Sequence, residues 1–472
     1  MSDERCLDRR QFLGLLAAAL GTGTAGAVEL LTHQAGPRSG PTASRLARGA
    51  ANGAAPNGPT SADDPTTSAP APGPAAGRHA DRAAHHEQAA EATKPDLPTP
   101  LPVDQRTLVV ITLYGGNDSM NMLVPYEDSR YYVARGRVAV PASSVLPLGD
   151  GLGLHPNLKS MRGHWQAQEM AVVRGVGYPN PNRSHFVSMA IWQTASPSTP
   201  ATTGWLGRWL DAAGGDDPAR ALAIGSSVPV MLRGERSSAG AIPSGPFFVP
   251  GGHGGSLDRA FDAMMVPSSS QPPLQRGVAQ AGTDMESLSQ LLAGDVGAGP
   301  AEQPPALEAD AGALGDALGV VARLIRAGAE TKVYSVSMGG FDTHADQPST
   351  QPKLMAQLDA ALANFWSSVA GHPRRNGIVV AIYSEFGRRV QPNSSAGTDH
   401  GSAGHMFLLG TPVKTGFHGD QPDLTRLLDG DLAPTTDFRS VYSALLGGVV
   451  GFNPSASLGP GAPNPLDVIR ET

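Results

Sequence analysis

Apolar segments of strand length recur along the chain after residue 105. They lie at Thr107–Tyr114, Met170–Val176, Val333–Met338, Gly377–Tyr383 and Met406–Leu409. The first is a nearly continuous run of apolar and β-branched residues, which is typical of a strand covered on both faces, and the others are similar to it. The pattern therefore indicates a largely parallel sheet with helices packed against it.

Helical periodicity appears between several of these segments. Apolar residues recur at spacings of three and four in Ala313–Ala327 and Leu354–Val369, as at Leu314, Leu318 and Val321. The second helix bridges two predicted strands, which is a βαβ crossover. We therefore predict an α/β domain with a mostly parallel central sheet and helices on both faces.

One region departs from this alternation. Residues Gly234–Pro305 are richer in Gly, Pro and Ser. We interpret them as excursions from the sheet with one or two short helices, such as Leu257–Met265.

The first 27 residues have the features of an export signal. Arg9 and Arg10 are followed by Phe12, an apolar stretch at Leu13–Leu20 and the small-residue sequence Ala-Gly-Ala that ends at Ala27. This pattern predicts a twin-arginine signal cleaved after residue 27. The apolar stretch is too short to cross about 30 Å of hydrocarbon, so we expect no stable transmembrane helix after cleavage. The twin-arginine translocase would then deliver the protein to the periplasm, the cell surface or the medium.

Residues 28–104 are dominated by Ala, Pro, Gly, Ser and Thr without hydrophobic periodicity. Such a segment cannot bury enough apolar surface to offset its ordering entropy, so we predict a flexible linker. His79, His85 and His86 lie in it, and we interpret them as solvated side chains. The folded domain is predicted to span residues 105–472.

Charge and cysteine content limit the partners and the metal ions that the protein is expected to bind. The formal net charge is −7 and no basic stripe is present, so nucleic acid is not an expected partner. The single cysteine, Cys6, lies within the predicted signal. Any metal must then be held by His, carboxylate or amide groups, which favours zinc, manganese, calcium, magnesium or iron.

Polar clusters follow the predicted strands, at the edge where ligands gather in open parallel sheets. Their possible metal ligands are Asp118, Asp342, His344, Glu385, Asp399, His400 and His405. Taken singly, each has an ordinary alternative role as a turn residue, a helix cap or a satisfied polar group. Their joint occurrence at one edge predicts a site for a divalent metal, most simply zinc, manganese or calcium, with one or two ions.

Ser184 opens a predicted amphipathic helix, where the positive end of the helix dipole would favour an anion. A serine beside one or two metal ions can transfer phosphoryl or sulfuryl groups. The alternative is an ordinary N-cap. Arg183 and Arg388 could clamp an oxyanion, or they could be salt-bridge partners.

The motifs together resemble those of the "domain of unknown function 1501" family over about Arg106–Leu446. They are Leu-Tyr-Gly-Gly-Asn-Asp-Ser-Met-Asn, Arg-Ser-His-Phe, Gly-Gly-Phe-Asp-Thr-His, Ser-Glu-Phe-Gly-Arg and Thr-Asp-His-Gly. The resemblance implies membership in the alkaline phosphatase and sulfatase superfamily, with an α/β sandwich and a one-metal or two-metal site. It also implies that Asp342, His344 and His400 hold the first metal, with Asp118 near a further metal-binding carboxylate and Ser184 near the nucleophile.

Two departures from the superfamily pattern concern the second metal. Glu385 takes the place of the acidic residue in an Asp-His pair, but Phe386 follows it where the superfamily has His, and the Asp after the first strand is shifted by a few residues. Either His405 or Asp399 substitutes, or the site holds one ion, or it has lost catalysis and only binds.

The leading hypothesis is an exported, metal-dependent hydrolase acting on a small anionic phosphate or sulfate ester. The alternative is a non-catalytic envelope or secreted protein that binds a ligand on the same scaffold, which the long linker would suit.

Overall fold

The computed structural model describes residues 97–197, 201–214, 217–245, 259, 263–297 and 311–471. The predicted signal peptide, nearly all of the predicted linker with its histidines, and most of the short helix expected at Leu257–Met265 lie outside the described residues. Among the helices that the structure describes, none is long and apolar enough to span a membrane.

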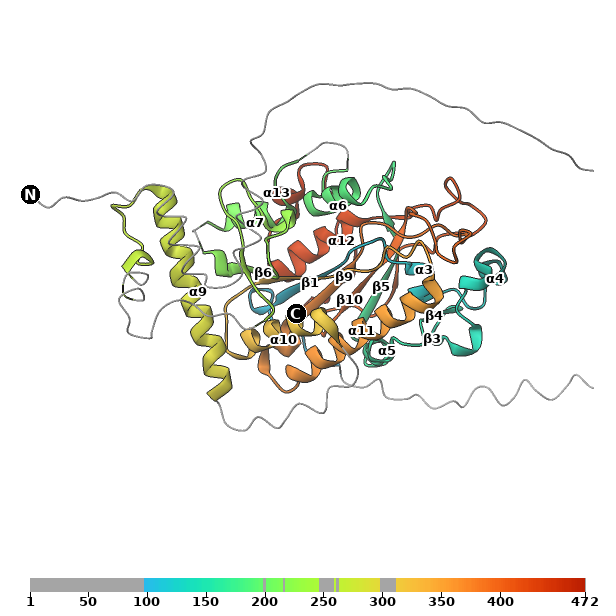
Figure 1. The fold of residues 1–472 in the computed structure, drawn as a ribbon, viewed down its shortest axis with the longest axis horizontal. Helices are drawn as coiled ribbons and strands as arrows, with labels where there is room; N and C mark the ends of the chain where they lie inside the picture. Colours follow the sequence, from blue (N-terminus) through green and yellow to red (C-terminus); the bar gives the residue numbers. More distant parts are fainter. Residues whose placement is uncertain are drawn as a thin grey trace, which may run out of the picture. The chain divides into compact units, whose positions relative to one another are not determined.

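The centre of the fold is a sheet with the strand order β11-β5-β10-β9-β1-β8-β6-β7, in which β12 also pairs with β5 (Figure 1). The strands are β1 (Thr107–Leu113), β5 (Met170–Gly177), β6 (Ala221–Ile224), β7 (Gly240–Ile242), β8 (Val333–Met338), β9 (Ile378–Tyr383), β10 (Gly404–Leu409), β11 (Gly416–His418) and β12 (Thr436–Asp437). β1 pairs in parallel with both β8 and β9, and β10 runs antiparallel to β9 and β5. This topology confirms the predicted mostly parallel sheet.

Helices cover both faces of the sheet (Figure 1). One layer contains α5 (Lys159–Gln166), α10 (Gly312–Arg326) and α11 (Gln347–Ser368), and the other contains α6 (His185–Thr194), α7 (Trp205–Ala213) and α12 (Phe438–Leu445). Alternate residues of β1 enter the two cores: Val109 and Ile111 pack with the first layer, Leu108 and Val110 with the second. Each fully buried aliphatic side chain of this kind contributes about 1.5–3 kcal/mol to folding.

α11 connects β8 to β9 across β1 and is the crossover helix that the sequence predicts. It begins at Gln347, earlier than the apolar periodicity indicates. Gln347 and Gln351 lie in its first turns, and both are buried because they hydrogen-bond to Asp118. The periodicity misses this part of the helix because its buried face is polar.

The Gly-rich and Pro-rich region also differs from expectation, since it contains the long helix α9 (Pro273–Gly297). Ala279 and Leu288 of α9 are buried, and α9 packs against α10. The smaller elements are α3 (Ser119–Met122), β2 (Leu123–Val124), α4 (Ser129–Arg135), β3 (Leu146–Gly149), β4 (Leu152–Leu154) and α13 (Pro454–Leu458).

Candidate functional site

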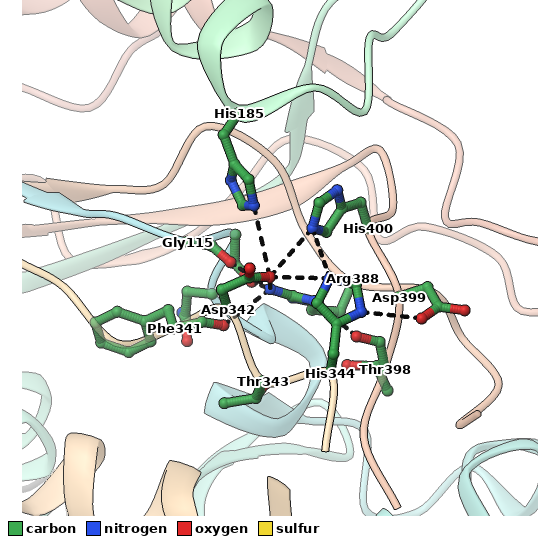
Figure 2. A network of polar contacts seen from close by, with 12 residues as sticks. Gly115, His185, Phe341, Asp342, Thr343, His344, Arg388, Thr398, Asp399 and His400 are labelled. Carbon is green, nitrogen blue, oxygen red and sulfur yellow. Dashed lines mark hydrogen bonds and ion pairs between the residues drawn. The ribbon is translucent and has the colours of Figure 1, made fainter. Parts of the chain in front are cut away.

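Three histidines and one aspartate converge at one edge of the sheet (Figure 2). Asp342 and His344 follow β8, His185 is the first residue of α6, and His400 lies in the segment that connects β9 to β10. Because β10 is antiparallel to β9, this connection stays at the edge formed by the carboxyl ends of β1, β8 and β9. The edge is the one at which the sequence predicts a site.

The Oδ1 atom of Asp342 is the centre of this group. It lies 3.0 Å from Nε2 of His344, 3.1 Å from Nε2 of His400 and 3.5 Å from Nε2 of His185. The Nε2 atoms of His344 and His400 are 2.8 Å apart.

Each of the three rings is oriented through its other nitrogen. Nδ1 of His185 donates to Oε1 of Glu385 at 2.8 Å, and Nδ1 of His400 donates to the backbone carbonyl of Arg183 at 2.8 Å. Nδ1 of His344 lies 3.0 Å from Oδ1 of Asp399. An acceptor at Nδ1 turns the Nε2 atom inward, the arrangement that metal-ligating histidines use.

The donor set fits a divalent metal ion. His185, Asp342 and His400 each offer one ligand atom, and these atoms lie within 4.8 Å of one another. Nε2 of His185 is buried, and no hydrogen bond reaches it from the described residues. A buried polar atom without a partner is costly, and a metal ion at this place would satisfy it. Imidazole and carboxylate ligands together suit zinc, manganese or iron.

Arg388 fixes the charge state of Asp342. Burial raises the pKa of the Asp342 carboxyl, but hydrogen bonds from Arg388 at 2.6 Å and from His400 outweigh this and lower it to about 2. The guanidinium is fully buried and also donates to the backbone carbonyls of Gly115, Gly116, Phe341 and Thr398. Arg388 therefore has no free face for a substrate oxyanion. Of the two roles that the sequence left open, the structure gives Arg388 that of a salt-bridge partner, which holds Asp342.

Gly115 lets the loop after β1 approach the loop after β8. Its φ is +116°, and a Cβ there would lie 2.4 Å from the backbone nitrogen of Asp342. The Gly115 N–H donates to Oε1 of Glu385 at 2.9 Å. A side chain at this position would separate the two loops and misplace Asp342.

Glu385 and Asp399, both predicted as ligands, orient ligand rings in this structure. Glu385 is 1% exposed, and its Oε2 atom accepts from the Ser384 hydroxyl at 3.0 Å while Oε1 faces His185. Asp399 is exposed and accepts from Asn393 at 3.0 Å. Hydrogen bonds from Asn393 and His344 lower the pKa of the Asp399 carboxyl, so it is ionised and accepts from the ring.

Arg183 and Ser184 lie in the segment between β5 and α6. The Arg183 side chain pairs with the buried carboxylate of Asp431, at 2.8 Å from Nε, which is the salt-bridge role that the sequence analysis gave as an alternative to a clamp. Ser184 occupies the N-cap position of α6, but its hydroxyl makes no capping hydrogen bond and its side chain is exposed. The ordinary N-cap alternative thus lacks its hydrogen bond, and the hydroxyl next to His185 is free.

Asp118 and His405 are not part of the converging group. Asp118 is buried in an ion pair with Arg135, accepts from Gln347 and caps α3. His405 is buried in β10 and accepts from the backbone N–H of Gly175. Burial lowers the pKa of His405 to about 3, so it is neutral. Both side chains make contacts within the fold and are not among the candidate metal ligands.

His185 is the site residue that the sequence analysis did not identify. The Arg-Ser-His-Phe motif directed attention to the hydroxyl of Ser184, whereas the imidazole one residue later points at Asp342 (Figure 2). The signal available was its place as the first helical residue at the predicted edge. Phe386, the residue that departs from the superfamily pattern, packs its ring against His185 and His400, with centroid distances of 5.0 and 4.9 Å.

A mostly parallel α/β fold with a histidine and aspartate site at its carboxyl edge defines the class of this protein. Residues 105–447 match the model of the family described as "Protein of unknown function (DUF1501)", and the chain belongs to that family. No curated protein matches the sequence.

Solved structures with weak similarity include a protein in the alkaline phosphatase superfamily and a sulfatase. A protein in the alkaline phosphatase superfamily from Vibrio parahaemolyticus has 10% identity and a TM-score of 0.29, over 67% of this chain and 62% of its own. The chain thus spans less than two thirds of that protein. The sulfatase PsFucS1 from Pseudoalteromonas sp. has 9% identity and a TM-score of 0.32, over 73% and 68% of the two chains.

Proposed function

We propose that this protein is an exported, metal-dependent hydrolase of phosphate or sulfate esters. The observation that carries the proposal is the convergence of three Nε2 atoms on Oδ1 of Asp342, with the Nε2 atom of His185 buried and without a hydrogen bond. An arrangement of this kind is expensive to maintain unless a cation completes it.

The residues of the site have distinct proposed roles. His185, Asp342 and His400 would hold the ion, with His344 beside them, and the ion would supply positive charge to stabilise the charge that develops on the transferring group. Glu385 and the backbone carbonyl of Arg183 fix the ring orientations of His185 and His400. Because these acceptors are fixed before substrate arrives, little reorganisation is needed.

Ser184 is the proposed nucleophile. Its hydroxyl is exposed and unbonded at the start of α6, and the first N–H groups of that helix are not capped by a side chain. Ester oxygens would be favoured there by the helix dipole. In the proposed reaction, Oγ of Ser184 forms a bond to phosphorus or sulfur as the alcohol leaves with a proton, and water then releases the inorganic anion and restores the hydroxyl.

Export is the remaining part of the proposal, and it is supported by the twin-arginine pattern at Arg9 and Arg10. The twin-arginine route accepts folded proteins, which would allow the ion to be loaded before translocation. A fusion of residues 1–27 to a reporter that is active only outside the cytoplasm tests this. An Arg9→Lys and Arg10→Lys version that is exported equally well would contradict it.

The activity is tested by turnover of aryl phosphate and aryl sulfate esters by the metal-loaded and the chelator-treated protein. We expect metal-dependent turnover of at least one ester, and a loss of at least 100-fold in kcat with Ser184→Ala. Ser287→Ala, at an exposed serine on α9, is the matched control. Equal rates for Ser184→Ala and the parent would remove Ser184 from the mechanism. A metal-loaded protein that turns over neither ester would favour the non-catalytic alternative.

A further inference from the structure

We infer that the site takes a single divalent ion, and that the buried guanidinium of Arg388 is the second positive charge of the site. The inference rests on the metal site of the proposed function and specifies it further. Three observations support it: the hydrogen bonds and ion pairs that the neighbouring carboxylates already make, the position of Phe386 and the contacts of Arg388.

The carboxylates that could complete a second metal group are already engaged. Asp118 is 2% exposed, and its oxygens are occupied by Arg135, by Gln347 and by the backbone N–H of Asn121. Releasing Asp118 for a metal would leave the fully buried Arg135 without its counter-charge. That is a severe penalty for a group out of contact with water.

Glu385 is equally committed. Oε1 accepts from the Gly115 N–H and from the ring of His185, and Oε2 accepts from the hydroxyl of Ser384. If Glu385 turned to bind an ion, its hydrogen bond to His185 would be lost. The His185 ring would then no longer be held in the orientation that the first ion requires. His185, Asp342 and His400 offer ligand atoms within 4.8 Å of one another, and Nε2 of His344 is in contact with two of these atoms, so all the candidate ligands belong to one group.

Phe386 fills the space beside the two rings. Its side chain is 3% exposed and packs against both His185 and His400. It is also in close contact with the loop after β1, where a Cβ on Gly116 would lie 2.2 Å from the Phe386 ring. A buried apolar ring offers no ligand atom to a second ion.

Arg388 supplies a positive charge beside Asp342 in place of a second metal ion. Its guanidinium donates to Oδ1 of Asp342 and is held in place by backbone carbonyls from the loops after β1 and β8. It therefore places a permanent positive charge on the carboxylate that the first ion uses. A further divalent ion next to it would be repelled by that charge.

The experiment counts ions in the full chain. Zn²⁺ and Mn²⁺ are titrated by calorimetry and the complexes are weighed by native mass spectrometry, for the parent chain and for a His185→Gln, Asp342→Asn and His400→Gln variant. Subtracting the ion count of the variant from that of the parent corrects for ions bound elsewhere in the chain, for example by His79, His85 and His86. His372→Asn, which keeps the capping acceptor at the start of its 3-10 helix, is the matched histidine control.

We expect the difference to be one ion, and we expect an isolated, uncoupled Mn²⁺ spectrum by electron paramagnetic resonance. Asp118→Asn should leave the count at one in the fraction that folds, as judged by circular dichroism. A difference of two ions, or a spin-coupled Mn²⁺ pair, would overturn the single-ion inference and leave the proposed hydrolase intact. A difference of zero would overturn both.

Discussion

Nδ1 of His185 lies 2.8 Å from Oε1 of Glu385, a carboxylate that is 1% exposed. The pairing joins the first residue of α6 to the second residue after β9, and so it ties the second helix layer to the sheet edge. It also fixes which nitrogen of His185 is free to bind a metal.

Replacing Glu385 with Gln should weaken metal binding without unfolding the protein. The amide oxygen can still accept from His185 and from the Gly115 N–H, but the negative charge that makes the ring a better ligand is lost. Orienting partners of this kind are worth roughly 10- to 100-fold in metal affinity. Calorimetric titration with Zn²⁺ measures the change, with Glu286→Gln on α9 as the control. An unchanged affinity would show that Glu385 serves the fold alone.

Breaking the buried ion pair of Asp118 and Arg135 should lower stability. Arg135→Met leaves the Asp118 carboxylate buried without its counter-charge, at a cost of about 3–5 kcal/mol in the free energy of unfolding. Adding Asp118→Asn to this variant should recover part of the loss, because both charges are then absent. Urea unfolding of the two variants tests the coupling. A double variant no more stable than Arg135→Met would argue against it.

The free energy of unfolding should fall as the pH drops from about 6.5 towards about 3. Burial lowers the pKa of His405 from its ordinary value to about 3. The unfolded chain therefore binds a proton in this window that the folded chain does not, and stability falls by up to about 1.4 kcal/mol per pH unit for each such group. His155, whose pKa is lowered to about 4 by burial, adds to the same trend. His405→Gln should reduce the slope of stability against pH, and His418→Gln on β11 is the control. Parallel slopes for the parent and His405→Gln would contradict the assignment.

Phe186→Ala should affect substrate use and leave stability unchanged. The Phe186 side chain is 90% exposed and directly follows His185, so its removal from the surface changes stability by no more than about 0.5 kcal/mol. An ester with an aryl group would lose apolar contact, and KM for aryl phosphate or aryl sulfate should rise several-fold while kcat changes little. Val133→Ala, at another exposed apolar residue, is the control. A fall in kcat at constant KM would indicate a different role for Phe186.

Continuous apolar runs predicted the central strands well, because buried parallel strands have few alternatives once helices separate them. β1 and β8 begin at the residues expected, Thr107 and Val333. The short edge strands β7 and β11 were not predicted, because three residues carry too little pattern. The early part of α11 was missed because Gln347 and Gln351 are polar and buried.

The sequence placed the candidate residues at the edge where the structure brings polar side chains together, but which side chains meet there required three-dimensional information. Asp342, His344 and His400 converge as the sequence suggested. Whether a carboxylate binds an ion or another side chain depends on neighbours that are distant in sequence. For Asp118 the deciding neighbour is Arg135, and for Glu385 it is His185. The spacing of these residues along the chain does not predict either pairing.

The antiparallel direction of β10 has a consequence for how such a site can change over evolution. The connection from β9 to β10 begins and ends at the same edge, and it carries Glu385, Arg388, Asp399 and His400. Insertions or substitutions within this one segment could alter the site without disturbing the register of any strand. A parallel β10 would have required the chain to return to the opposite edge first. Divergence of chemistry among related chains is therefore expected to concentrate in this connection, while the strands on either side keep their lengths.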